Sequence, residues 1–486
     1  MKSFYSFFSQ TFFYGISSVL ARVLNFFLVP LYTNIFPADQ YGLVTVMYSS
    51  IVFIFIISSL GMESAFFRFI NKEQNKKEVY STVGWLLIFS SFLILVLGQL
   101  FIFSIEPTSQ YFPYLTWIFL IVFLDTLCVL PFAKLRQEEK AKKFALIKTI
   151  NIILNISFNI FFLVICPYLL EHEPLRYEWV NVLFNKEVGI GYIFISNLLA
   201  SGATFLLLLP SIYNLLSWKN FSISLVSKML RYSSPLIFAG LAYATNEVAD
   251  KIILSLLLDN KEVGIYGACY KLSIFMILFI QAYRYTVEPY YFNNSTKKDF
   301  KKSYSKIMTY FVLTSLFIFL IVSINKDYII LLLGKQYGYR EGVEIIPIIL
   351  MSHLFLGMYY ILAMWYKLTD KTKFGAYISV MGAVITIVLN FLLIPRIGYF
   401  GSAWATFFCY FFMALVSFIM SNKYYFIPYE KKKIVIYFIF SLAIYIAGNF
   451  LNMNHWIYNL VIIAIYVSFV LFLEKLIFKI KLSNKN

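Results

Sequence analysis

Charged residues are scarce in this sequence, and they form no polar stretch long enough to make a soluble domain. Only 13% of the 486 residues are Asp, Glu, Lys or Arg, whereas 60% are hydrophobic, 20% are aromatic, and the mean hydropathy is +0.76. A soluble fold of this length could not bury so much apolar surface. The composition therefore excludes a water-soluble globular protein and indicates an integral membrane protein.

Cysteine and histidine are also rare. The four cysteines lie within or at the edge of apolar segments, and the three histidines are scattered, so neither type shows metal-ligand spacing or a disulfide framework. The seven residues are Cys128, Cys166, Cys269, Cys409, His172, His353 and His455. We predict no metal or other cofactor, interpret the cysteines as packing residues, and find little support for a zinc enzyme or a Ser/His hydrolase.

Apolar runs of about twenty residues recur along the chain, and each is long enough to cross a hydrocarbon layer roughly 30 Å thick as a helix. The sequence therefore predicts an all-α polytopic membrane protein with fourteen transmembrane helices. The predicted spans are 11–33, 43–67, 80–104, 114–134, 146–169, 188–214, 231–255, 264–288, 305–326, 343–366, 376–396, 399–422, 433–450 and 456–478. Prolines 30, 235 and 347 fall inside spans, where they permit kinks.

Lys and Arg residues alternate between dense and sparse loops, which predicts the topology. If the N-terminus is cytoplasmic, 30 of the 41 Lys and Arg residues lie in inside segments, 7 lie in outside loops, and 4 lie within spans. Inside loops of membrane proteins are enriched in these residues. We therefore predict cytoplasmic termini, and we interpret the net charge of +17 as a topology signal rather than as a sign of nucleic-acid binding.

Two short internal similarities indicate a repeat. Residues 36–48 resemble residues 258–270 at a constant offset of 222, which aligns Gly42 with Gly264. A weaker similarity links residues 159–191 with residues 390–401. We predict a six-helix N-terminal lobe over residues 1–215, a six-helix C-terminal lobe over residues 216–430, and helices 13 and 14 with a cytoplasmic tail over residues 431–486, with chance similarity as the alternative.

Several of these residues also resemble a known family. The resemblance rests on Tyr14-Gly15, Arg22, Asn25, residues 30–33, Phe36, Tyr41-Gly42 and residues 61–68 near the N-terminus, and on residues 390–406 later in the chain. The pattern is similar to that of bacterial oligosaccharide flippases of the polysaccharide-transporter family (Wzx-like), within the MATE/MOP superfamily. The likeness in helix number, order and length covers essentially the whole chain.

The resemblance implies a non-enzymatic transporter in the bacterial inner membrane, with two six-helix lobes that open alternately to the two sides. It implies a cargo of undecaprenyl-diphosphate-linked oligosaccharide repeat units for O-antigen (and so lipopolysaccharide), capsule or exopolysaccharide synthesis. The implied partners are this lipid-linked cargo and the bilayer itself. Proton or sodium coupling and an association with polysaccharide polymerase and assembly proteins are further candidates.

Three alternatives stay open. A lipid II flippase and a multidrug exporter belong to the same superfamily, although an exporter of cationic drugs is expected to use acidic cavity residues, and the unpaired intramembrane charges here are basic. A membrane-embedded polysaccharide polymerase would need catalytic residues in a large outside loop. The only candidate loop, residues 170–187, is short and lacks a convincing acid and base pair.

Ionisable side chains inside spans are the candidate functional residues, since each costs about 2.5 to 3.5 kcal/mol to insert. Arg22 has no acidic residue three or four positions away on its own helix. A guanidinium binds phosphate through parallel charge-assisted hydrogen bonds, so we predict that Arg22 grips the diphosphate. The alternative is an interhelical ion pair with Asp125 or Glu63.

The other intramembrane charges extend this prediction. We interpret Lys251, Lys271 and Arg284 as further substrate-binding candidates. The acidic residues Asp125, Glu63, Glu247 and Asp250 are candidates for ion coupling or counter-charge. Glu247 and Lys251, with Asp250 on the same face, and likewise Arg284 and Glu288, are spaced so that they can instead neutralise one another within a helix.

Overall fold

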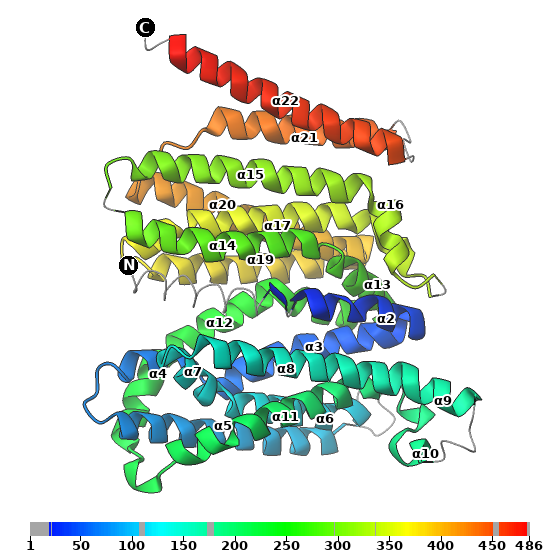
Figure 1. Ribbon diagram of the computed structural model, residues 1–486, viewed down its shortest axis with the longest axis vertical. Helices are drawn as coiled ribbons and strands as arrows, with labels where there is room; N and C mark the ends of the chain where they lie inside the picture. The colour runs from blue at the N-terminus through cyan, green and yellow to red at the C-terminus, as the bar shows by residue number, and fades with distance from the viewer. Residues whose placement is uncertain are drawn as a thin grey trace. The chain divides into compact units, whose positions relative to one another are not determined.

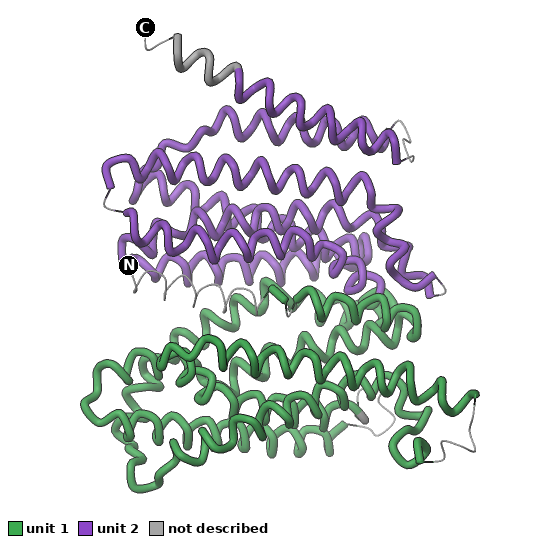
Figure 2. Tube along the Cα trace, in the orientation of Figure 1, with its two compact units in different colours: residues 1–264 green, residues 265–486 purple. Residues whose placement is uncertain are grey.

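The computed structural model describes residues 19–20, 22–105, 112–172, 179–295, 297–335, 337–450 and 456–483. Across these residues the chain is helical and contains no β-strand. They fall into two compact units, residues 1–264 and residues 265–486, which Figure 2 shows in different colours. The sequence-based division at 215/216 and 430/431 groups the helices differently and stays a prediction.

The first unit is a bundle in which α5, α6, α8 and α11 pack on one another and α12 packs on α3, α4 and α5 (Figure 1). Its helices are α2 (Leu28–Ile35), α3 (Ala38–Ser59), α4 (Met62–Phe69), α5 (Lys76–Phe103), α6 (Phe112–Leu127), α7 (Val129–Gln137), α8 (Ala141–Ile160), α9 (Cys166–His172), α10 (Val180–Leu183), α11 (Gly191–Leu215) and α12 (Ile223–Leu257).

The second unit is a bundle of α14, α15, α17, α19 and α20, with α21 and α22 side by side along α15 (Figure 1). The helices are α13 (Asn260–Lys271), which spans the boundary between the units, α14 (Ile274–Asn294), α15 (Phe300–Ile324), α16 (Lys326–Ile329), α17 (Ile345–Leu362), α18 (Met364–Leu368), α19 (Lys373–Ile397), α20 (Tyr399–Tyr424), α21 (Lys431–Phe450) and α22 (Trp456–Ser483).

The membrane spans agree with the hydropathy pattern. Among the described residues, 11 helices are long and apolar enough to cross a membrane, or 12 if the bent pair α13 and α14 is one span. Each coincides with a predicted span to within a few residues. The remaining two predictions are 11–33, which lies mostly outside the described residues, and 231–255, which falls on the more polar α12. The all-α polytopic class is confirmed, and the count of fourteen stays a prediction.

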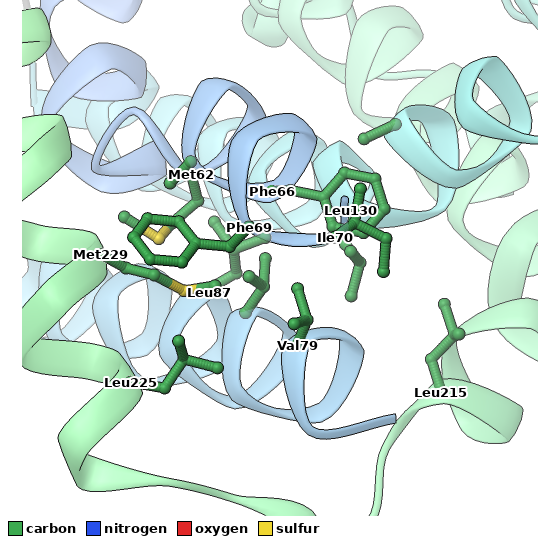
Figure 3. Packing of buried hydrophobic residues seen from close by; sticks show 13 residues of the cluster. Met62, Phe66, Phe69, Ile70, Val79, Leu87, Leu130, Leu215, Leu225 and Met229 are labelled. Carbon is green, nitrogen blue, oxygen red and sulfur yellow. The ribbon is translucent and has the colours of Figure 1, made fainter. Parts of the chain in front are cut away.

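An apolar cluster of the first unit joins α4 to α5 and α12. Met62, Phe66 and Phe69 of α4 are inserted between α5 and α12, where they meet Val79 and Met229 (Figure 3). Such interdigitation recovers dispersion contacts that lipid cannot supply as densely. The cluster therefore fixes α4 as a short separate helix after the left-handed turn at Leu60 and Gly61.

The prolines predicted to allow kinks mark helix joins. Pro30 lies in the first turn of α2, directly after the break at Phe27, and Pro347 lies in the first turn of α17, just after a 3₁₀ segment that ends at Glu344. A proline cannot donate to the carbonyl four residues earlier, so the preceding turn must end there. Pro235 differs, because it lies inside the long helix α12.

Gly42 of α3 and Gly264 of α13 face each other across a very close helix contact. A Cβ atom on Gly42 would collide with the carbonyl oxygen of Asn260, and one on Gly264 would collide with the carbonyl oxygen of Ala38. Asn260 follows Ala38 by 222 positions, and Gly264 follows Gly42 by the same offset, so the two contacts are reciprocal. This symmetry between positions that the sequence alignment matched supports the predicted internal repeat.

Substituting either glycine with alanine is expected to destabilise the protein, because the added methyl group meets backbone that cannot rotate away. We expect Gly42→Ala and Gly264→Ala each to lower the free energy of unfolding by roughly 1 to 3 kcal/mol, as overpacking typically does. Thermal unfolding in detergent measures this. Gly202→Ala is the matched control, since a Cβ at Gly202 meets nothing within 4 Å. Unchanged stability of Gly42→Ala would contradict the close contact.

Candidate functional site

Arg22, the principal sequence candidate, lies in the helical turn of residues 22–26 that precedes α2, and its side chain is exposed. Neither predicted counter-charge contacts it in the described part of the chain. Glu63 instead pairs with Arg136 of α7, and Asp125 has its own neighbours. The exposed guanidinium is therefore available to a ligand, as the diphosphate hypothesis requires, although its role stays a prediction.

Asp125 of α6 lies among polar groups from two other helices. The Ser201 hydroxyl of α11 is its hydrogen-bond partner, and Lys148 of α8 lies within electrostatic reach. Asn197 of α11 donates to the hydroxyl of Tyr48 on α3 at 3.2 Å. These polar side chains inside the first unit can stabilise one charge away from lipid. Such surroundings suit either ion coupling or structural pairing.

The acidic and basic residues of α12 are neutralised locally. The Lys251 ammonium donates to both carboxylate oxygens of Asp250, at 2.8 and 3.1 Å, and to the Glu247 carbonyl at 3.2 Å. Both charged side chains are almost fully buried. The sequence predicted neutralisation on this helix, and the structure shows Asp250 as the carboxylate partner. Because the Lys251 ammonium already donates hydrogen bonds to Asp250, this geometry favours structural pairing for Lys251 over substrate binding.

A cluster of two cations and one carboxylate lies in the second unit, in the second half of α14. Glu288 accepts a hydrogen bond from the Lys367 ammonium of α18 at 2.9 Å, and its same oxygen lies 3.7 Å from Nε of Arg284. The Arg284 guanidinium stacks over the Tyr360 ring of α17, with 4.1 Å between its Cζ and the ring centroid. The sequence predicted the Arg284 and Glu288 pair, and the structure adds Lys367 and Tyr360.

This cluster, Arg284, Glu288, Tyr360 and Lys367, retains unused capacity to bind an anion. Two cations share one carboxylate, and all three charged side chains are about one-third exposed. Nε of Arg284 is buried and has no hydrogen-bond partner among the described residues. A buried donor without a partner is costly, so an oxyanion that reaches the guanidinium gains strong charge-assisted hydrogen bonds.

Lys271 is the last residue of α13, and its side chain is exposed. It adjoins the 49° bend between α13 and α14. Lys271 and Arg284 lie on different helices of the second unit, whereas Arg22 and Lys251 belong to the first unit.

His353, which showed no partner pattern in the sequence, holds this bend in place. Its Nε2 lies 3.1 Å from the Tyr270 hydroxyl at the end of α13, and its Nδ1 lies 3.2 Å from the Ser273 hydroxyl at the start of α14. Ser273 donates its only hydroxyl proton to the Tyr270 carbonyl, at 2.7 Å. It must therefore accept from Nδ1, so Nδ1 carries a proton.

Reasoning from sequence missed the partners that come from distant parts of the chain. In the sequence, Arg136, Lys148 and Lys367 lie in or beside the inside segments, and the structure brings each close to a carboxylate of another helix. The only local signal was their place at the edges of apolar runs, which cannot reveal the facing helix. The four cysteines are free and buried, as predicted.

Similarity to known proteins assigns the chain to a family. A family model described as polysaccharide biosynthesis protein matches residues 7–292, which is more than half of the chain. The chain belongs to this family. A second model, MatE, matches residues 235–392 of this polysaccharide biosynthesis protein.

Solved structures show the same fold. A lipid II flippase, MurJ, aligns over 95% of this chain and 99% of its own length, with a TM-score of 0.72 and 15% identity. An inward-facing multidrug resistance MATE family transporter of the MOP superfamily aligns over 83% of this chain and 94% of its own, with a TM-score of 0.64 and 12% identity. At these identities the likeness concerns the fold alone, and it confirms the predicted MOP-type architecture.

A curated relative matches part of the sequence. An uncharacterised membrane protein of Methanocaldococcus jannaschii is 25% identical over 178 residues, which are 37% of this chain and 42% of that protein. The match thus spans less than half the length of that relative.

The His353 contacts predict a specific coupling. His353→Phe keeps an aromatic ring but removes the hydrogen bond with the Tyr270 hydroxyl, which is expected to cost about 0.5 to 1.5 kcal/mol of unfolding free energy. In a double-mutant cycle with Tyr270→Phe, the double variant should lose less than the sum of the two single variants. Thermal unfolding in detergent measures both quantities. The exposed His172→Phe serves as control, and strictly additive losses at His353 and Tyr270 would rule out the assigned hydrogen bond.

Proposed function

We propose that this polysaccharide biosynthesis protein is a flippase that moves undecaprenyl-diphosphate-linked oligosaccharide repeat units across the bacterial plasma membrane. The units would serve O-antigen, capsule or exopolysaccharide synthesis. The protein opens alternately to either side of the membrane, and both termini are cytoplasmic. The sugars and the diphosphate travel along its polar interior while the polyprenyl chain stays in lipid.

The observation that carries this proposal is the surplus of positive charge in the Arg284 cluster. A diphosphate has several acceptor oxygens, which suit a guanidinium and an ammonium that share only one carboxylate. The Tyr360 ring under the guanidinium keeps the Arg284 fork in one orientation. An exporter of cationic drugs would gain nothing from such a surplus. Membership of the polysaccharide family supports a sugar-linked cargo.

The role of each charge follows from its surroundings. Arg22 and the Arg284 cluster bind the diphosphate, each within its own unit. Asp125, with Ser201 and Lys148 beside it, is the candidate for proton or sodium coupling. Glu63 and Asp250 are counter-charges to Arg136 and Lys251. Polysaccharide polymerase and assembly proteins would receive the cargo on the far side of the membrane.

A lipid II flippase is the second candidate, and the fold similarity to MurJ favours it. Lipid II shares the polyprenyl diphosphate, so the Arg284 cluster suits it equally. The two candidates differ in the sugar and peptide part of the cargo. A transport assay that offers both lipids separates them.

Removing either proposed diphosphate contact should stop transport in cells. We expect Arg22→Ala and Arg284→Gln each to reduce surface polysaccharide by at least about tenfold, because each lost charge-assisted hydrogen bond is worth about 1.5 to 3 kcal/mol. Arg22→Lys should retain only part of the activity, since an ammonium cannot form the bidentate contact. Surface polysaccharide and membrane protein level are both measured by immunoblot.

Lys302→Ala is the matched control for loss of a positive charge, because its side chain is 80% exposed and it lies at the start of α15, away from the proposed contacts. It should leave surface polysaccharide unchanged. Normal polysaccharide from the Arg22→Ala variant, at normal protein level, would remove Arg22 from the mechanism. The same result for Arg284→Gln would remove the cluster.

A further inference from the structure

A cavity of about 300 Å³ lies within the second unit, between α21 and the bundle formed by α15, α17 and α20. Its walls are apolar and aromatic, with Phe355 and Phe411 on one side and Val435 on the other. Lys431, at the start of α21, is the one charged residue in its lining. The cavity is therefore an apolar slot with a single positive charge at one end.

The cavity exists because α21 packs along α15 and α22 but makes few contacts with α17 and α20. Phe438 of α21 stacks on Phe355 of α17 with 5.7 Å between ring centroids. Tyr437 donates to Glu474 of α22, at 2.7 Å. Otherwise α21 is largely uncovered, and only 11% of its apolar window is buried. An apolar gap beside a helix that faces lipid forfeits dispersion contacts unless a hydrocarbon chain fills it.

The charge at the end of the slot is not neutralised by the protein. The Lys431 ammonium lies 4.9 Å from the centroid of the Phe418 ring, and no carboxylate pairs with it in the described structure. Lys433, two residues later, is instead paired with Glu430 and Glu474. Lys431 thus brings to the slot a positive charge that no carboxylate of the described residues pairs with.

An anionic lipid has two parts that match this arrangement, an acyl chain for the apolar slot and a negative headgroup for Lys431. The alternation of basic loops predicts that α21 begins on the cytoplasmic side, where anionic headgroups are concentrated. Basic pockets between transmembrane helices on that side bind anionic lipid headgroups. A phosphate at Lys431 would place the attached acyl chain at the entrance of the slot.

We propose that this cavity binds one anionic phospholipid of the membrane, with an acyl chain in the slot and the phosphate at Lys431. The lipid fastens α21 to the bundle of the second unit. This inference is independent of the proposed cargo, because none of the residues assigned to diphosphate transport lines the cavity.

Photolabelling of the full-length protein in nanodiscs tests the proposal. The probes are phosphatidylglycerol and phosphatidylcholine that carry the same photoreactive acyl chain, in a phosphatidylcholine background, and labelled peptides are mapped by mass spectrometry. We expect phosphatidylglycerol to label α20 and α21 at the slot at least about fivefold more than phosphatidylcholine does. Lys431→Glu should abolish this preference, whereas Lys432→Glu, whose side chain does not line the cavity, should keep it.

A second pair of variants tests the slot itself without changing charge. Ala414→Phe fills the cavity and should block labelling by either lipid, whereas Ala443→Phe, on the exposed face of α21, should not. Equal labelling by both lipids, unaffected by Lys431→Glu, would overturn the proposal. If a polyprenyl-diphosphate sugar prevents labelling and unlabelled phosphatidylglycerol does not, the proposal is also overturned and the slot is assigned to the cargo.

Discussion

A hydrocarbon layer offers no hydrogen bonds, so each polar group that this chain places among its spans must find a partner inside the protein. Asn390 of α19 shows the result: its amide donates to the Thr386 carbonyl at 2.7 Å, and its oxygen accepts from Ser402 of α20 at 2.8 Å. Asn159 of α8 repeats the arrangement, donating to the Asn155 carbonyl and accepting from Tyr32. Twelve buried side-chain atoms of the described residues lack a hydrogen-bond partner, and Nε of Arg284 is the only one of them that belongs to a charged group. The Arg284 cluster is for that reason the best candidate for ligand binding.

The same constraint explains what could be predicted from sequence. Spans follow from length and hydropathy, which are local properties, so their positions agree with the helices to within a few residues. The two asparagines that the weak internal similarity aligned are both fully buried. The aligned glycines Gly42 and Gly264 are in contact. These features were visible because each depends on residue type at a fixed position in a repeat.

Partners across helices could not be predicted in this way. Glu63 and Arg136 are 73 residues apart, and Lys367 and Glu288 are 79 residues apart. Helical spacing finds only pairs three or four residues apart, such as Arg284 and Glu288, which the structure shows at 3.7 Å. His353 illustrates the limit most clearly, since its two partners flank a helix break about 80 residues earlier in the chain. Which helix faces which is decided by packing of the whole bundle, and no single segment encodes it.

Transbilayer movement of a defined lipid tests whether the protein is a flippase that recognises a diphosphate through Arg284. The full-length protein is reconstituted into liposomes that contain a fluorescent polyprenyl-diphosphate oligosaccharide or its polyprenyl-monophosphate counterpart, and the fraction that reaches the opposite leaflet is followed by quenching from outside. We expect rapid protein-dependent movement of the diphosphate lipid, slower movement of the monophosphate, and loss of the difference in Arg284→Gln. Equal rates for both lipids in the native protein, or no movement of either in correctly inserted protein, would contradict this expectation.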